Sequence, residues 1–306
     1  MSTARPPIDI DGAVAVVTGG AGGIGKGIVT ALLQRGATVV VADVERPALD
    51  ATVAELSSLG PVEGVVTNVA DEHSFEALAD HVFRTHGRCN LLFNNAGVGS
   101  GGGGKAWESE PNDWRWCFSV NVFGAANGVI AFVPRMIESG EPGHVINTSS
   151  GDGGFAPVPM ATVYASSKAA LSCFTESLHA QLLAVTDTIG ASVFYPSGGL
   201  LNTGLYNSHR NRPAELERVR GGTGRTPMSF EELKAALERS GRDVKVADLD
   251  ELGRFVVDCV HERRYIIARD IDETVELLHR RADAIGRFEA PPHHEMGLPT
   301  TGKPTG

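Results

Sequence analysis

Short apolar runs alternate with longer segments in which apolar residues recur at helical spacing. The apolar runs have the length of buried parallel strands and are expected at 13–18, 37–43, 62–66, 89–93, 144–148, 191–195 and 264–268. The helical segments are expected at 24–35, 48–59, 73–86, 112–136, 161–183, 230–239, 248–261 and 272–287. Strands that alternate with helices in this way predict an α/β fold built on a parallel sheet.

A glycine-rich turn joins the first expected strand to the first expected helix. Its sequence fits a general dinucleotide fingerprint, and also the narrower spacing Thr-Gly-x-x-x-Gly-Ile-Gly. Glycines let the backbone approach a pyrophosphate, and the helix N-terminus offers it free N–H groups. The candidate cofactor-binding residues of this turn are Gly19, Gly23, Ile24 and Gly25.

Polar and small residues follow the ends of the next three strands. Asp43 ends the second strand, where a carboxylate can accept hydrogen bonds from the adenosine ribose and would repel the 2′-phosphate of NADP. Asn68 follows the third strand, where its amide can meet an adenine. Residues after the fourth strand are small enough to leave room for a ribose. The further candidates at these strand ends are Val44, Val69, Asn95, Ala96 and Gly97.

Tyr164 and Lys168 are the candidate proton-transfer pair. Four residues apart in an expected helix, they share one face, and an ammonium near a phenol lowers the phenol's pKa from about 10. Such a pair can exchange a proton with an alcohol or a carbonyl. Ser150 follows the fifth strand and is expected to face the same cleft. Asn121 lies in an apolar stretch, either as a core amide bonded to backbone or as an anchor for a water near Lys168.

Composition narrows the classes of protein that the chain can be. The 306 residues carry a net charge of −10 with no basic cluster, which argues against a nucleic-acid partner. No signal-peptide pattern and no run of ~20 apolar residues is present, so we expect no membrane partner and a cytoplasmic location. Four separated cysteines are expected to be reduced thiols. No metal site is expected, because the pair His293-His294 has no H-E-x-x-H context.

The periodic pattern breaks after the sixth strand. Residues 200–243 form a long insert that we expect to act as a substrate lid, within one domain that spans 1–306. Two of its arginines, Arg210 and Arg212, are expected on its solvent face. The final residues, 290–306, are rich in Pro, Gly and Thr and are expected to be disordered. The apolar side chains expected to cover a bulky aromatic or cyclic substrate are Leu201, Leu205, Tyr206, Met228, Phe230 and the wall Pro157-Val158-Pro159-Met160.

Taken together, the glycine turn, Asn94-Asn95-Ala96-Gly97, Asn121, Ser150 and Tyr164-x-x-x-Lys168 resemble the short-chain dehydrogenase/reductases. The resemblance covers about residues 12–196. It implies a doubly wound Rossmann-type sheet of seven parallel strands with helices on both faces, with the lid insert and a C-terminal helical extension added to it. It also implies NAD as cofactor.

The same resemblance assigns roles to the residues. Tyr164 is the acid/base, Lys168 lowers its pKa and holds the nicotinamide ribose, Ser150 binds the substrate oxygen, and Asn121 anchors a relay water. Ser149 is an alternative to Ser150, because the Ser-to-Tyr spacing is 14 where many members have 13. Contacts to the nicotinamide carboxamide are expected from Pro196, Ser197 and Thr203, although the usual Pro-Gly is Pro-Ser here.

A narrower resemblance, carried by 132–137, Gly143-His144, 211–214 and the long tail, is to a bacterial branch of the family. That branch includes the Cα-dehydrogenases, which oxidise benzylic alcohols of lignin-derived dimers. We therefore expect an NAD-dependent oxidoreductase of a secondary alcohol or ketone, and a homodimer or homotetramer. The alternatives are a non-catalytic NAD(P)-sensing regulator and an NAD-dependent epimerase or dehydratase.

Overall fold

Seven parallel strands form one sheet at the centre of the molecule. This computed structural model describes residues 5–99, 104–219, 228–241 and 243–294. The strand order is β3-β2-β1-β4-β5-β6-β7, and every neighbouring pair is parallel, as expected from the family resemblance. The last strand is shorter than expected because only two of its residues pair with β6. The strands are β1 (Val14–Thr18), β2 (Thr38–Asp43), β3 (Val62–Val66), β4 (Leu91–Asn94), β5 (Gly143–Thr148), β6 (Ile189–Phe194) and β7 (Ile266–Ile267).

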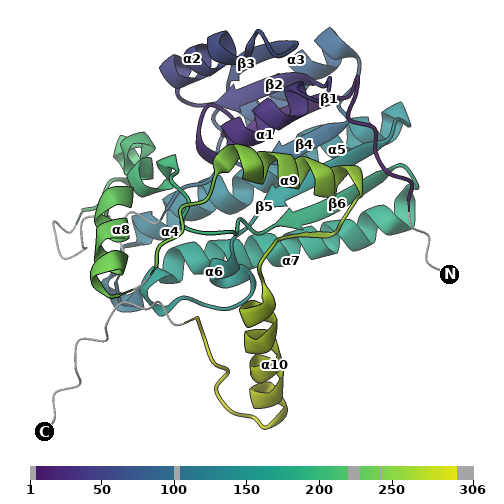
Figure 1. Cartoon of the computed structure of the whole chain (residues 1–306). Helices are drawn as coiled ribbons and strands as arrows, with labels where there is room; N and C mark the ends of the chain where they lie inside the picture. Colours follow the sequence, from purple (N-terminus) through teal and green to yellow (C-terminus); the bar gives the residue numbers. More distant parts are fainter. Residues whose placement is uncertain (1–4, 100–103, 220–227, 242, 295–306) are drawn as a thin grey trace, which may run out of the picture.

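Helices cover both faces of the sheet (Figure 1). Because successive strand residues point to opposite faces, Ala15 and Val17 of β1 join one apolar cluster, and Val14 and Val16 join the other. The first cluster contains side chains of α1 (Gly23–Leu33), α2 (Arg46–Leu56) and α9 (Leu249–His261). The second contains side chains of α3 (Glu72–His86), α5 (Gly124–Ser139) and α7 (Thr162–Val185).

Helix α1 is held in place by a close crossing with α9. A Cβ atom on Gly27 would lie 2.2 Å from the carbonyl oxygen of Leu249, and one on Gly253 would lie 2.2 Å from that of Gly27. The two backbones can therefore touch only because both positions are glycine. The contact fixes the N-terminus of α1, which carries the glycine turn, against the sheet.

The long apolar segment expected as a helix over 112–136 is helical without a break from Pro111 to Ser139, but a π-helical turn interrupts its α-helical hydrogen-bond pattern. It consists of α4 (Pro111–Phe118), a π-helical turn (Ser119–Phe123) and α5. Asn121 lies inside the π turn, and such turns are common at functional sites. Pro111–Ser139 is long and apolar enough to cross a membrane by length and composition alone, a test that core helices of globular proteins also pass. Here the segment packs against α3, β4 and α7.

The region after β6 crosses the carboxyl ends of the strands and then leads to α9. The described part contains the 3₁₀ segments η4 (Gly204–Asn211) and η5 (Ala214–Leu216), and then α8 (Phe230–Arg239), the helix expected there. Helix α10 (Asp272–Gly286) extends away from the rest of the molecule (Figure 1). Of the tail expected to be disordered, 290–294 are described, and the backbone N–H of His294 donates to the carbonyl oxygen of Pro157 at 3.1 Å. Residues 295–306 lie outside the described residues. The remaining short helical elements are η1 (Ala106–Glu108), α6 (Gly151–Gly154) and η3 (Pro159–Ala161).

Candidate active site

A cavity of about 560 Å³ lies at the carboxyl ends of the strands, beneath residues 199–213. It includes the ends of β1 and β4, the neighbouring strands from which the strand order runs outward in opposite directions. Open α/β sheets bind their ligands at such a point. Nearly all of the predicted site residues lie on its wall. These are Gly19, Gly23, Ile24, Gly25, Asp43, Val44, Asn68, Val69, Asn95, Ala96, Gly97, Ser150, Tyr164, Lys168, Pro196 and Thr203.

The glycine turn provides a shallow backbone surface at the N-terminus of α1. Gly19 has a φ of +62°, and a Cβ there would lie 2.9 Å from the Cα of Ala96, so only glycine fits. At Gly22 a Cβ would meet no atom within 4 Å, so the space in front of the turn is open. Open space next to the free N–H groups of a helix N-terminus fits a pyrophosphate.

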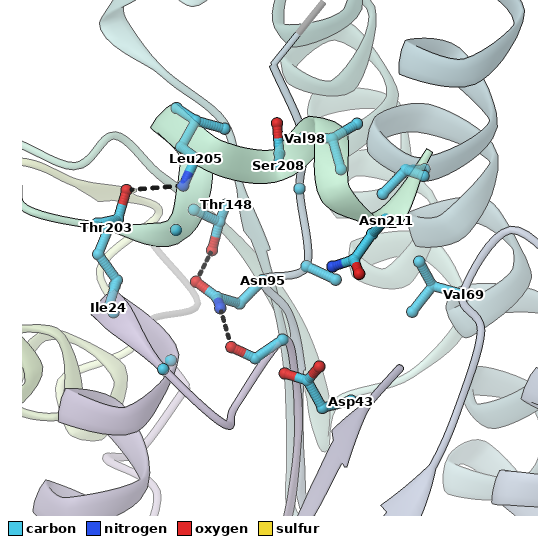
Figure 2. Close-up of a pocket in the computed structure, with 18 of the residues that line it drawn as sticks. Ile24, Asp43, Val69, Asn95, Val98, Thr148, Thr203, Leu205, Ser208 and Asn211 are labelled. Carbon is cyan, nitrogen blue, oxygen red and sulfur yellow. Dashed lines mark hydrogen bonds between the residues drawn. The ribbon is translucent and has the colours of Figure 1, made fainter. Parts of the chain in front are cut away.

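Asn95 and Thr18 connect the ends of three strands, and Figure 2 shows the bond from Thr148 to Asn95. The Thr18 hydroxyl oxygen accepts from the backbone N–H groups of Asn95 at 3.0 Å and Ala96 at 3.1 Å. The Asn95 amide donates to the Thr18 carbonyl oxygen at 3.0 Å, and its oxygen accepts from the hydroxyl of Thr148 at 3.3 Å. These bonds hold the Asn95 side chain in a fixed position, where it forms part of the cavity wall.

Asp43 is held rigidly at the end of β2. One carboxylate oxygen accepts from the backbone N–H of Ala21 and the other from that of Glu45, both at 3.1 Å. The carboxylate therefore faces the glycine turn, at the position where the fold binds an adenosine ribose. Asn68 lies on the same wall, and its side-chain oxygen accepts from the backbone N–H of Ala70 at 3.1 Å.

Ser150, Tyr164 and Lys168 meet at the other end of the cavity. The hydroxyl of Ser150 hydrogen-bonds the phenol of Tyr164. Burial raises the pKa of Tyr164 above its ordinary value, and the bond to Ser150 opposes this only in part. Lys168 is only 3% exposed, and its ammonium donates to the carbonyl oxygen of Thr148 at 2.8 Å. Burial lowers the pKa of Lys168 to about 8.

The expectation that Lys168 lowers the pKa of Tyr164 does not hold in the chain by itself. The ammonium nitrogen lies 5.7 Å from the centre of the tyrosine ring and is bonded to Thr148. Desolvation of the phenol therefore dominates, and the phenol is held protonated. A protonated phenol bonded to a serine hydroxyl can give its proton to a carbonyl oxygen at this position.

The two adjacent serines have different surroundings. Ser149 is buried, and its hydroxyl bonds to the carbonyl oxygen of Lys168 at 2.9 Å and to the hydroxyl of Ser172 at 2.8 Å. Ser150 is half-buried and accepts from the backbone N–H of Asp152 at 3.1 Å. The phenol of Tyr164 bonds to Ser150, which favours Ser150 for the substrate-binding role.

Asn121 does not line the cavity, although it lies close to Lys168. Its side-chain oxygen accepts from the N–H of Val98 at 2.8 Å, and its amide donates to the Val98 carbonyl oxygen and to Ser167, both at 3.0 Å. The side chain is thus a buried amide satisfied by its neighbours, and the role of Asn121 as an anchor for a relay water stays a prediction. A Cβ on Gly97 would lie 3.4 Å from both the Asn121 oxygen and the Lys168 nitrogen, so the two groups border the same glycine.

Three sequence-based expectations about the walls need correction. Ser197 is not among the lining residues, because its hydroxyl turns away and accepts from the N–H of Arg269 at 3.0 Å. Residues 157–160 are also absent from the wall. Met228 and Phe230 do not reach the cavity, but the Phe230 ring packs edge-on against Tyr206 with centres 5.8 Å apart.

Only one of the two lid arginines expected on the solvent face departs from that expectation: Arg212 is buried, whereas Arg210 is 38% exposed although it also lines the cavity. Arg210 lines the cavity and forms an ion pair with Glu45. Arg212 is 8% exposed and donates to Asp113 at 2.8 Å. Arg218 donates to both oxygens of the same carboxylate at 2.9 Å. Burial alone would raise the pKa of Asp113, but the two guanidiniums hold it below its usual range.

Several lining residues escaped the sequence analysis. Their types are common, and only the position of the lid over the strand ends brings them to the wall. Ser208 is one example, since its hydroxyl accepts from the N–H of Gly99 at 3.0 Å and so attaches the lid to the end of β4. The residues of this kind are Glu45, Trp116, Asp152, Ser208, Arg210 and Asn211.

Comparisons with known proteins agree with this geometry. A Cα-dehydrogenase from Sphingobium sp. (strain NBRC 103272 / SYK-6) is 38% identical over 209 residues, which are 68% of this chain and 66%, just under two thirds, of that protein. A short chain dehydrogenase/reductase from Burkholderia phymatum in complex with NAD superposes with a TM-score of 0.83 at 33% identity, over 94% of this chain and 99% of that one.

A metagenomic short-chain oxidoreductase in complex with NADP has a TM-score of 0.58 at 33% identity, over 62% of this chain and 85% of that one. Residues 13–211 match the sequence model of the short chain dehydrogenase family. That match contains the glycine turn, Ser150, Tyr164 and Lys168. The chain belongs to the short-chain dehydrogenase/reductase family.

Proposed function

We propose that the chain is an NAD-dependent dehydrogenase/reductase that interconverts a secondary alcohol and a ketone. The observation that carries this proposal is that Ser150, Tyr164 and Lys168 lie on one cavity wall together with the open glycine turn. An acid/base phenol, a hydroxyl beside it and a pyrophosphate-binding turn are the groups that hydride transfer to a carbonyl requires.

In the proposed mechanism the nicotinamide, when bound, supplies or accepts the hydride at the substrate carbon. Tyr164 gives its proton to the ketone oxygen during reduction and takes it back during oxidation. Ser150 donates to the same oxygen and fixes its position next to the phenol. Lys168, whose ammonium is anchored to Thr148, provides a positive charge under the site, and below a pH of about 8 it is protonated.

The carboxylate of Asp43 supports NAD as the cofactor. It would accept hydrogen bonds from the ribose hydroxyls, and it would repel a phosphate on the 2′ position. The similarity to the NAD complex from Burkholderia phymatum also supports NAD. The less extensive similarity to an NADP complex is the reason to compare the two cofactors by experiment.

The apolar part of the wall supports a substrate with an aromatic or cyclic group. Leu201, Leu205 and Trp116 line the cavity, and the Tyr206 ring, braced by Phe230, lies beside them. Apolar area of this kind contributes about 25 cal/mol per Å² removed from water. The 38% identity to a Cα-dehydrogenase supports the same class of substrate.

The test is a panel of alcohols with NAD, followed by the absorbance of NADH. We expect 1-arylalkanols and cyclic alcohols to give higher kcat/KM than 2-propanol or lactate. The reverse order would refute the proposed substrate class, and no net NADH with any secondary alcohol, despite NAD binding, would refute the dehydrogenase itself.

We also propose that the protein is a homo-oligomer. Ile130 and Phe123, on and next to α5, are 72% and 58% exposed, which is costly for large apolar side chains on a free surface. Sedimentation velocity should show a dimer or tetramer, and an Ile130→Arg variant should shift it toward the monomer. A wild-type monomer at micromolar concentration would contradict this proposal.

A further inference from the structure

An ion pair closes the cavity over the place where the adenosine ribose is expected. Arg210, in η4 of the lid, donates through Nε to one oxygen of Glu45 at 3.2 Å and through Nη2 to the other oxygen. The amide of Asn211 adds a third bond to Glu45 at 2.7 Å. Arg210, Asn211 and Glu45 all line the cavity. The lid and the edge of the sheet are therefore joined at one carboxylate.

Both partners of this pair are held by their own elements. The backbone N–H of Glu45 donates to Asp43 at 3.1 Å, which ties the turn after β2 to the carboxylate at the strand end. Arg210 donates through Nη1 to the carbonyl oxygens of Asn207 at 2.7 Å and Gly204 at 3.2 Å. Its guanidinium is thus fixed within the lid, and Figure 2 shows Asn211 and Asp43 on the wall of the same pocket.

The charges at this edge bear on the choice between NAD and NADP. Among the described residues that line the cavity, the basic ones are Lys168, at the reacting end, and Arg210. Two other cations near the glycine turn and β2 are engaged elsewhere, Lys26 with Glu55 at 2.7 Å and Arg46 with Asp50 at 3.7 Å, and neither lines the cavity. Among the residues that the structure describes, Arg210 is therefore the cation available to a 2′-phosphate, and Glu45 is paired with it.

We propose that Glu45 is a second determinant of cofactor choice, because it holds Arg210 in a two-point ion pair and so withholds that guanidinium from the 2′-phosphate of NADP. The inference rests on the proposed dinucleotide site. Asp43 acts directly, by meeting the ribose hydroxyls, whereas Glu45 acts through Arg210. With Glu45 charged, the edge carries two carboxylates and one guanidinium, and a phosphate is repelled. With Glu45 neutral, the charges of Asp43 and Arg210 balance, and a guanidinium can pair with the phosphate.

The experiment measures binding of NADH and NADPH by the fluorescence of the reduced nicotinamide, without a substrate. The variants are Glu45→Gln, Arg210→Met and the double variant. We expect Glu45→Gln to improve the NADPH-to-NADH affinity ratio by about tenfold, the size of one charge-assisted hydrogen bond. Arg210→Met should bring no improvement, and in the double variant the gain should be lost. The gain should also shrink as salt is added.

Glu55→Gln is the control, since it frees Lys26, a cation of similar exposure to Arg210, from an ion pair outside the cavity. Its affinity ratio should equal that of the wild type. If Glu45→Gln does not fold, Glu45→Ser replaces it. An unchanged ratio in the Glu45 variants, or a gain that survives in the double variant, would overturn the role of Glu45. If the wild-type protein binds neither dinucleotide, the proposed function itself fails.

Discussion

The hydroxyl of Ser149 bonds to the carbonyl oxygen of Lys168 at 2.9 Å, so this serine braces the helix that carries Tyr164 and Lys168. Ser150, the next residue, instead bonds to the phenol of Tyr164. Two adjacent serines therefore support the same pair of residues, one from the side of the helix and one from the side of the cavity.

This difference predicts opposite results for two alanine variants. Ser150→Ala should lower kcat by about 10²-fold, the usual cost of removing one donor at the reacting oxygen. Ser149→Ala should keep most of kcat. Its free energy of unfolding should fall by about 1 kcal/mol, because the variant lacks a buried hydrogen bond. Steady-state kinetics and urea unfolding of both variants decide the assignment. A larger loss of kcat in Ser149→Ala would assign the role to Ser149.

Replacing Tyr164 by phenylalanine should abolish proton transfer without disturbing the packing of the ring. General acid/base groups contribute roughly 10²–10⁴-fold, and kcat should fall by at least that amount. NADH affinity, measured by fluorescence, should stay close to that of the wild type. If turnover falls by less than about tenfold, Tyr164 is not the acid/base.

Asp43→Ser should weaken NADH binding while sparing the fold. The carboxylate accepts from the N–H groups of Ala21 and Glu45, and it would also accept from the ribose. Hydrogen bonds to a charged group contribute about 1.5–3 kcal/mol, so the dissociation constant should rise about ten- to a hundredfold. NADPH should be affected less, because a repulsive charge is removed at the same time. Titration of both nucleotides tests this, and equal losses would argue against Asp43 at the ribose.

The buried Asp113 should be essential for the attachment of the lid. It is 1% exposed and holds the guanidiniums of Arg212 and Arg218. Asp113→Ala would leave both without their carboxylate, and breaking a buried pair in this way costs about 3–5 kcal/mol. Limited proteolysis should then cut the chain faster within 200–219. The matched control is Asp50→Ala, which removes an exposed carboxylate and its ion pair with Arg46. Equal protease resistance in the two variants would be the contrary result.

His144 should make the protein sensitive to acid. It is buried, and its ring nitrogen Nε2 lies 2.6 Å from the hydroxyl oxygen of Ser192, which itself donates to the carbonyl oxygen of Arg264. The imidazole is therefore the donor in that bond, and its other nitrogen faces the guanidinium of Arg263. Burial, and then the charge of Arg263, lower the pKa of His144 to about 3.

Because a histidine in the unfolded chain has a pKa of about 6.5, the unfolded state binds the additional proton as the pH falls from there toward 3. The free energy of unfolding should therefore fall over that window, by up to ~5 kcal/mol from this residue. Urea unfolding at several pH values measures it. His144→Gln should flatten the profile, and His73→Gln, at an exposed position, is the control for losing a histidine. Identical slopes in wild type and His144→Gln would exclude the effect.

The local sequence determined the framework of this protein and most of the candidate site. Apolar residues repeat every two positions on a half-buried strand and every 3.6 positions on a half-buried helix, and short apolar runs mark fully buried strands. The strands, α8 and the glycine turn could therefore be predicted without any knowledge of their neighbours. Asp43 and Ser150 follow from the strand pattern, because the carboxyl ends of parallel strands meet at one edge of a sheet. Tyr164 and Lys168 follow from their four-residue spacing in an expected helix.

Only the tertiary structure decided what depends on contacts between distant segments. Arg210 and Arg212 are of a residue type that is usually exposed in a lid. They form ion pairs with Glu45 and Asp113, which are 165 and 99 residues away in sequence. The pKa of Tyr164 depends on burial and on the direction of the Lys168 ammonium, neither of which a four-residue spacing fixes. Long-range pairing and desolvation are properties of the folded arrangement, and no local pattern encodes them.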